Sequence, residues 1–192
     1  METHSMSTNK MTLKGALEHV EKVGRVAIFP EKNKKKSSII SLWELFFPRT
    51  KMKWEWDDSA DNRVVKLWWL KNEIAQTQKV LYGRFFGNRP ILVSKNEARR
   101  TMAGLERKPL SSLAREILSR LEDNSPQTKR MIGKSLRDDG WEITKGDFER
   151  ALLSLQKQFL IVNLGDSERE KGPMPSTEYA ALSLVFPDLK GR

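Results

Sequence analysis

Apolar residues recur along this chain with two different periods, and each period predicts a different kind of element. Spacings of three and four residues predict helices, whereas short unbroken apolar runs predict strands. In the first part of the chain we expect helices at 13–23, 39–47, 63–78 and 96–104, with strands at 25–30 and on both sides of a turn at 87–90. Further on we expect helices at 111–126, 127–140 and 144–159, a strand at 160–166, and a short helix that ends near Phe186.

Capping and turn residues mark several of these boundaries. Thr12 precedes the first apolar stripe and Gly24 follows it, as a helix N-cap and a left-handed C-cap require. Asp61 or Asn62 is placed to cap the helix at 63–78, and Thr144 to cap the helix at 144–159. The sequence Gly-Asn-Arg-Pro at 87–90, between two β-rich runs, predicts a β-hairpin.

The order of these elements predicts an α+β fold. We expect a flexible N-terminus at 1–11, then a mixed half with a basic β-hairpin at 12–108, then a winged helix-turn-helix at 109–192. Three helices followed by a strand and the polar loop 167–175 is the order of a winged helix, whose third helix enters the DNA major groove. The two halves are expected to pack as one compact unit.

Composition excludes several classes of protein. The chain has 192 residues, 38% of them hydrophobic, which suffices for a core. No apolar run approaches the ~18 residues that span a bilayer, so no membrane partner is expected. The first residues lack the apolar segment of a secretory signal. Cysteine is absent, which excludes disulfides and thiol catalysis and agrees with a reducing, cytoplasmic location.

Four of the six tryptophans fall in the stretch WEWDDSADNRVVKLWW at 54–69. Such rings could stack on bases, or they could fill the core. On the helix at 63–78, Trp68 and Trp69 follow Val64 and Val65 in a broad apolar sector, which favours the core. Trp54 and Trp56 are expected to pack under their loop, because the acids around them would repel a phosphate backbone.

Residues able to carry catalysis or hold a metal are scarce. The acids at 57–61 could supply a general acid–base pair, but acids beside a helix start are more often caps. The two histidines, His4 and His19, lie in the N-terminal tail and on the first helix, without metal-ligand spacing. We therefore expect no metal site and no cofactor.

The positive charge is unevenly distributed. Lys and Arg number 35 against 25 Asp and Glu, giving a net charge of +10 and a preference for polyanions. Residues 110–165 are nearly neutral, with nine basic and eight acidic residues, whereas 79–108 contain eight basic and two acidic residues. The central basic strip is either a solvated face or a phosphate-binding surface. The nucleic-acid-binding candidates are Arg84, Arg89, Lys95, Arg99 and Arg100 in the strip, and Lys129, Arg130, Lys134, Lys145, Arg150, Ser154 and Lys157 in the second half.

The order of aromatic and apolar segments resembles short bacterial relatives of the AlkZ-type winged-helix DNA glycosylases. The resemblance covers 13–165 and is carried by KVGRVAIFPEK, SLWELFFPR, KMKWEWDDSADNRVVKLWWLKNEIA, VLYGRFFGNRPILVS and DFERALLSLQKQFLIV. It implies a winged-helix DNA-binding module. The larger glycosylases stack several winged helices and place a Gln-x-Gln pair at the damaged nucleotide. Here Gln76 and Gln78 are weak catalytic candidates, because Thr77 stands between them where the family prefers an apolar residue.

Three functions remain open from the sequence. The preferred one is binding of duplex DNA by the winged helix, assisted by the central basic strip. A DNA glycosylase would instead need a cleft that places Gln76, or an acid of 57–61, beside Trp54. A protein-interaction module, with a protein partner or a second copy of the chain, would show an exposed apolar patch around the third helix.

Overall fold

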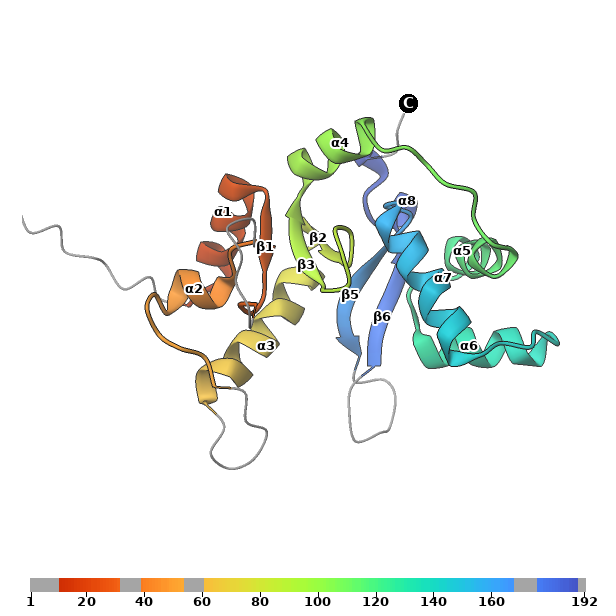
Figure 1. Ribbon diagram of the computed structural model, residues 1–192, viewed down its shortest axis with the longest axis horizontal. Coiled ribbons are helices and arrows are strands. Elements are labelled where there is room, and N and C mark those ends of the chain that lie inside the picture. Colours follow the sequence, from red (N-terminus) through yellow and green to blue (C-terminus); the bar gives the residue numbers. More distant parts are fainter. Residues whose placement is uncertain (1–10, 32–38, 54–60, 168–175, 190–192) are drawn as a thin grey trace, which may run out of the picture.

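The computed structural model describes residues 11–31, 39–53, 61–167 and 176–189. The first half folds around one three-stranded sheet covered by helices (Figure 1). Its elements are α1 Leu13–Val23, β1 Arg25–Ala27, α2 Leu42–Phe46, α3 Asn62–Gln76, β2 Val80–Gly83, β3 Ile91–Ser94 and α4 Lys95–Ala103. No helix in the described ranges has the length and apolar character needed to cross a membrane.

The sheet of the first half has the order β1-β3-β2 and is antiparallel throughout. Strands β2 and β3 pair from Val80 with Ser94 to Gly83 with Ile91, so the predicted hairpin is confirmed. Strand β1 joins the outer side of β3, with Arg25 opposite Val93. The expected caps are also in place: the Thr12 hydroxyl accepts from the Gly15 amide at 3.1 Å, and the Asp61 carboxylate accepts from the Arg63 amide at 3.0 Å.

The second half contains three helices and a second three-stranded sheet. Its elements are α5 Ser112–Asp123, β4 Gln127–Thr128, α6 Lys129–Asp138, α7 Lys145–Lys157, β5 Ile161–Ser167, β6 Ser176–Ala181, α8 Leu182–Val185 and the 3₁₀ helix η1 Pro187–Leu189. The sheet order is β4-β6-β5, all antiparallel. The three long helices and β5 lie where the sequence predicted them. The sequence did not predict β4 and β6, because β4 has only two residues and β6 runs directly into α8.

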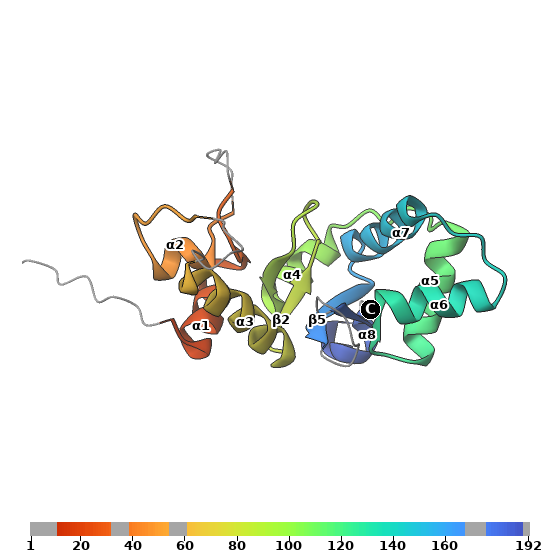
Figure 2. The same ribbon diagram turned by 90° about the horizontal axis from the view of Figure 1, so that it is seen from below.

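The two halves share a hydrophobic core and form one compact α+β unit, as expected from the sequence. At the junction, Phe85 of the first half stacks on Phe159 of the second, with ring centroids 4.5 Å apart. Strand β2 lies beside β5, and both views show the two sheets next to each other (Figures 1 and 2). The buried residues of this shared core are Ala27, Leu81, Phe85, Ile91, Val93, Ala98, Phe159, Val162, Ala180, Leu182, Phe186 and Leu189.

The tryptophans of α3 have different environments. Trp68 is half-buried, packs against the core of the first half and stacks on Phe29. Trp69 and Val65, one helical turn apart, are 46% and 42% exposed, so their assignment to the buried sector was wrong. The buried sector of α3 is narrower than the sequence indicated, because only one side of this helix faces α1 and the sheet of the first half. Several predicted features lie outside the described residues: residues 1–10 of the N-terminus, Trp54 and Trp56, the acids Asp57 and Asp58, and most of the polar loop at 167–175. Residues 32–38 also lie outside them.

A buried ion pair ties α3 to the second sheet. Lys71 Nζ donates to Asp166 Oδ2 at 2.6 Å, and the two side chains are only 3% and 7% exposed. Lys71 Nζ also donates to Asn72 Oδ1 at 2.7 Å, and Thr177 Oγ1 donates to Asp166 Oδ1 at 3.0 Å. Burial lowers the pKa of Lys71, and the hydrogen bond to Asp166 partly offsets this. A charge pair removed from water this completely fixes one arrangement of the two halves, since any displacement would leave a buried charge unpaired.

The two tyrosines of the chain, Tyr82 and Tyr179, are both buried, and burial raises the pKa of each phenol. A raised folded pKa means that the native state holds the phenolic proton where the unfolded state, with a pKa of about 10, releases it. The contribution of these groups to stability is therefore complete below about pH 10 and is lost as the pH rises further. We expect the 295 nm absorbance of tyrosinate to appear only together with alkaline unfolding. A reversible titration near pH 10 in the folded protein would contradict this expectation.

Candidate nucleic-acid interface

A groove of about 400 Å³ lies between α6 and the N-terminal turn of α7. Its lining combines Gly133, Ile143 and Phe148 with cationic side chains from both helices. Helices α6 and α7 lie together at the end of the molecule away from α1 and α2 (Figure 2). The residues that line the groove are Lys129, Arg130, Gly133, Arg137, Ile143, Thr144, Lys145, Phe148, Glu149 and Ser176.

The local sequence places these cations by fixing where the two helices begin. Thr128 caps α6 by accepting from the Met131 amide at 3.2 Å, and Thr144 caps α7 by accepting from the Asp147 amide at 3.1 Å. Lys129 and Lys145 consequently stand in the first turns of their helices. A cation in a first turn opposes the helix dipole at a cost of ~0.3–1 kcal/mol. An anion bound in the groove would compensate this cost, since helix N-termini attract negative charge.

The ion pairs of the groove leave part of its charge available. Lys129 pairs with Glu149 at 2.5 Å, and Arg84 approaches the same carboxylate at 3.4 Å. Burial opposes the charged form of Glu149, but these cations outweigh it and lower the pKa of the carboxyl. Arg130, Arg137 and Lys145 are exposed and form no ion pair with any residue that the structure describes. The groove therefore presents three uncompensated cations to solvent.

The other candidates of the second half lie outside this groove. Lys134 pairs with Asp138 at 2.5 Å, and Arg150 pairs with Asp147. Ser154 is half-buried and accepts from Gln158 Nε2 at 3.5 Å, and Lys157 is exposed at the last turn of α7. Of the seven candidates, the groove thus gathers only Lys129, Arg130 and Lys145, and it adds Arg137 of α6 to them.

Acids bind five of the eight cations of the central basic strip. Lys95 and Arg99 share Asp188, at 3.5 and 2.7 Å. Arg100 pairs with Glu97, a buried carboxylate that also binds Arg25.

The hairpin arginines of the strip are bound as well. Arg89 donates to the Phe29 carbonyl at 2.5 Å and pairs with Glu31 at 3.2 Å, while Arg84 is engaged with Glu149. Acids therefore bind Arg84, Arg89, Lys95, Arg99 and Arg100 of the strip. The other basic residues of the strip, Lys79, Arg107 and Lys108, are exposed and form no ion pair with any residue that the structure describes.

A model of one protein family, described as AlkZ related, matches residues 11–188, nearly the whole chain. The chain belongs to the AlkZ-related family. The family suggested by the sequence pattern is thereby confirmed. No curated protein matches the chain closely enough to name a relative.

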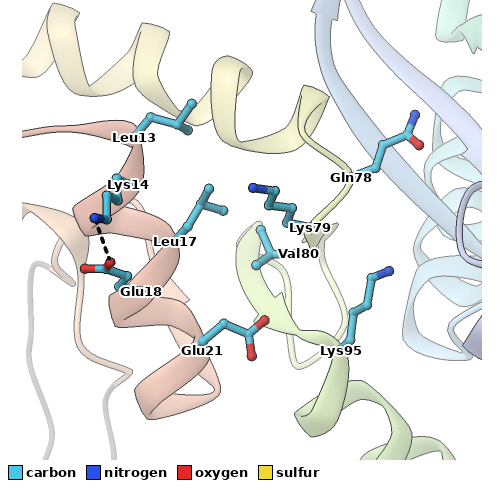
Figure 3. A pocket seen from close by; sticks show the side chains of 9 residues that line it. All are labelled: Leu13, Lys14, Leu17, Glu18, Glu21, Gln78, Lys79, Val80 and Lys95. Atoms are coloured by element: carbon cyan, nitrogen blue, oxygen red, sulfur yellow. Dashed lines mark ion pairs between the residues drawn. The ribbon is translucent and has the colours of Figure 1, made fainter.

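The glutamines that the AlkZ resemblance singled out lie at the end of α3. Gln76 is exposed, and Gln78 has a left-handed backbone with φ 53°. Gln78 stands at the edge of a pocket of about 840 Å³, in which Leu17, Lys79 and Val80 converge (Figure 3). The described lining of this pocket contains no aromatic ring, so a base that entered it would find no side chain on which to stack.

A second pair with the same spacing, Gln156 and Gln158, is buried in this AlkZ-related protein. Gln156 Oε1 accepts from the Arg84 amide at 2.6 Å, and Gln158 Oε1 accepts from the Lys108 amide at 3.1 Å. Both amides belong to the first half of the chain. This pair therefore satisfies backbone groups at the junction of the halves. Its Gln-x-Gln spacing was visible in the sequence, but its burial was not.

Proposed function

We propose that this AlkZ-related protein binds duplex DNA through the groove between α6 and α7. The observation that carries the proposal is the set of three exposed cations, Arg130, Arg137 and Lys145, without acidic partners among the described residues. Phosphate contacts from such side chains supply most of the non-specific affinity for DNA. Membership of a family named for AlkZ supports a DNA-related role.

The architecture of the second half supports a winged-helix mode of binding. Helices α5, α6 and α7 precede β5 and β6, and β4 completes a sheet of order β4-β6-β5. In this mode α7 is the helix offered to the major groove. Its basic residues outside the groove, Arg150 and Lys157, are exposed, and Arg150 is bound to Asp147. We therefore assign the phosphate contacts to the groove at the start of α7 rather than to its whole length.

Binding to a protein is the weaker proposal. The large hydrophobic residues exposed in the described part of the chain are Val23, Ile40, Val65, Trp69, Met131 and Leu184. None of these belongs to α7, which is described from end to end. A protein-interaction surface centred on the third helix would need such a patch there.

The proposal is tested by fluorescence anisotropy with labelled duplex, single-stranded and abasic-site DNA between about 50 and 200 mM salt. Affinity that depends on phosphate contacts falls steeply over this range. We expect duplex binding in which the logarithm of the affinity falls with the logarithm of the salt concentration with a slope of about −3, since each phosphate contact contributes about −0.9. Tighter binding of the abasic duplex would favour a glycosylase-like role. Absence of binding to all three DNAs at the lowest salt concentration would refute DNA binding.

A further inference from the structure

A second groove, of about 640 Å³, lies beside α2, at the end of the molecule away from α6 and α7 (Figures 1 and 2). Its volume falls in the range of about 300–1,000 Å³ that is usual for small-molecule sites. The proposed function uses the α6–α7 groove and does not involve this second groove. The residues that line it are Pro30, Glu31, Trp43, Glu44, Phe47, Arg49, Thr50, Lys51 and Met52.

One wall of this α2 groove is aromatic and rigidly held. Trp43 is buried, and its Nε1 donates to the Thr50 carbonyl at 2.9 Å, which ties the segment after α2 to the edge of the indole ring. Phe47 packs on Trp43 with centroids 4.8 Å apart and an interplanar angle of 54°. Phe47 itself is only half-buried and lines the groove, and the Arg63 guanidinium lies over its ring, 5.2 Å from the centroid. A planar ligand would therefore meet the part of the Phe47 ring that Trp43 and Arg63 leave uncovered.

The acids that line the α2 groove are bound by neighbouring groups, whereas two of its cations have no acidic partner among the described residues. Glu44 Oε2 accepts from the Ser41 amide at 2.9 Å and from its hydroxyl at 2.8 Å, completing a capping box. Glu31 pairs with Arg89 at 3.2 Å. The cations Arg49 and Lys51 are exposed and form no ion pair within the described ranges. Both acids are thus engaged in the fold, and the groove offers positive charge beside an aromatic ring.

We propose that the α2 groove binds one nucleotide unit, with its phosphate on Arg49 and Lys51 and its base against Phe47. A phosphate requires the unpaired cations, and a planar base requires the ring, so the two features together select this ligand over a simple anion or an apolar molecule. The unit could belong to a free mononucleotide or to a single-stranded end of nucleic acid. Both sources offer the same recognition chemistry.

The test uses the full chain and two probes, a deoxynucleoside monophosphate followed by calorimetry and labelled (dT)8 followed by anisotropy. The variant Arg49→Asn/Lys51→Gln removes both cations, and asparagine tolerates the left-handed backbone at position 49, where φ is 63°. Phe47→Leu removes the ring. We expect each variant to weaken binding about tenfold, as for the removal of charge-assisted or stacking interactions. The matched control Lys14→Gln/Lys22→Gln, which removes two exposed charges of α1, is expected to bind within about twofold of wild type.

Binding of the monophosphate would identify a free nucleotide as the ligand, and binding of (dT)8 alone would identify a strand end. Either result supports the site if the α2-groove variants abolish or weaken that binding. Failure of both probes to bind, or binding that these variants leave unchanged, would overturn the proposal. Variants of the α6–α7 groove, such as Arg130→Ala, test the proposed binding of duplex DNA separately, because the two grooves share no lining residue.

Discussion

Lys71→Met is expected to lower the free energy of unfolding by about 3–5 kcal/mol, the usual result of removing one partner from a buried ion pair. The substitution leaves the Asp166 carboxylate without its cation, on a side chain that is only 7% exposed. The Thr177 hydroxyl still donates to the Asp166 carboxylate, but a neutral donor cannot balance the charge. Urea unfolding followed by tryptophan fluorescence measures the destabilisation as a lower midpoint at an unchanged slope.

Two further variants separate the charge effect from simple removal of a lysine. Lys66→Met changes an exposed lysine of the same helix and is expected to alter stability by no more than about 0.5 kcal/mol. Lys71→Met/Asp166→Leu removes both charges and is expected to recover most of the stability, since a buried pair and an apolar pair of similar volume are often nearly equivalent. If Lys71→Met destabilised no more than Lys66→Met, the buried pair would not hold α3 against the second sheet.

Arg130→Ala/Arg137→Ala/Lys145→Ala is expected to weaken duplex binding by about 10³-fold at low salt, since each charge-assisted hydrogen bond contributes about 1.5 kcal/mol or roughly tenfold. These are the cations of the α6–α7 groove that lack acidic partners in the described structure. The slope of log affinity against log salt should become shallower by about one unit for each cation that is removed. Anisotropy titrations at several salt concentrations give both quantities.

The matched control removes three cations from the central basic strip. Lys95, Arg99 and Arg100 are already bound to Asp188 and Glu97, so Lys95→Ala/Arg99→Ala/Arg100→Ala is expected to change duplex affinity much less than the groove variant. If the strip variant bound DNA more weakly and the groove variant did not, the interface would lie on the strip. Thermal unfolding of both variants verifies that each remains folded.

The contrast between these two surfaces shows what the sequence could and could not reveal about the candidate site. Counting charges along the chain indicated 79–108 as the basic region, because it sums neighbours in sequence. The acid that binds Arg99 is Asp188, 89 residues away. The α6–α7 groove, in contrast, lies in a segment that is nearly neutral overall. Its cations come together only because the start of α7 lies beside α6, which a count along the sequence cannot show.

The sequence by itself determined the elements whose signals are local. Apolar spacing, the caps Thr12, Asp61 and Thr144, and the turn at 87–90 depend on residues a few positions apart, so the helices and the β2–β3 hairpin were predictable. The α+β class followed from their order. These features are fixed by backbone hydrogen bonding and capping that act within one or two turns.

Only the tertiary structure decided which side chains are buried, paired or free. It placed Lys71 against Asp166, 95 residues away, and left Trp69 exposed beside the half-buried Trp68. It also added β1 to the hairpin and β4 and β6 to the second sheet. Burial and ion pairing depend on which distant surfaces meet, and local periodicity contains no information about that meeting.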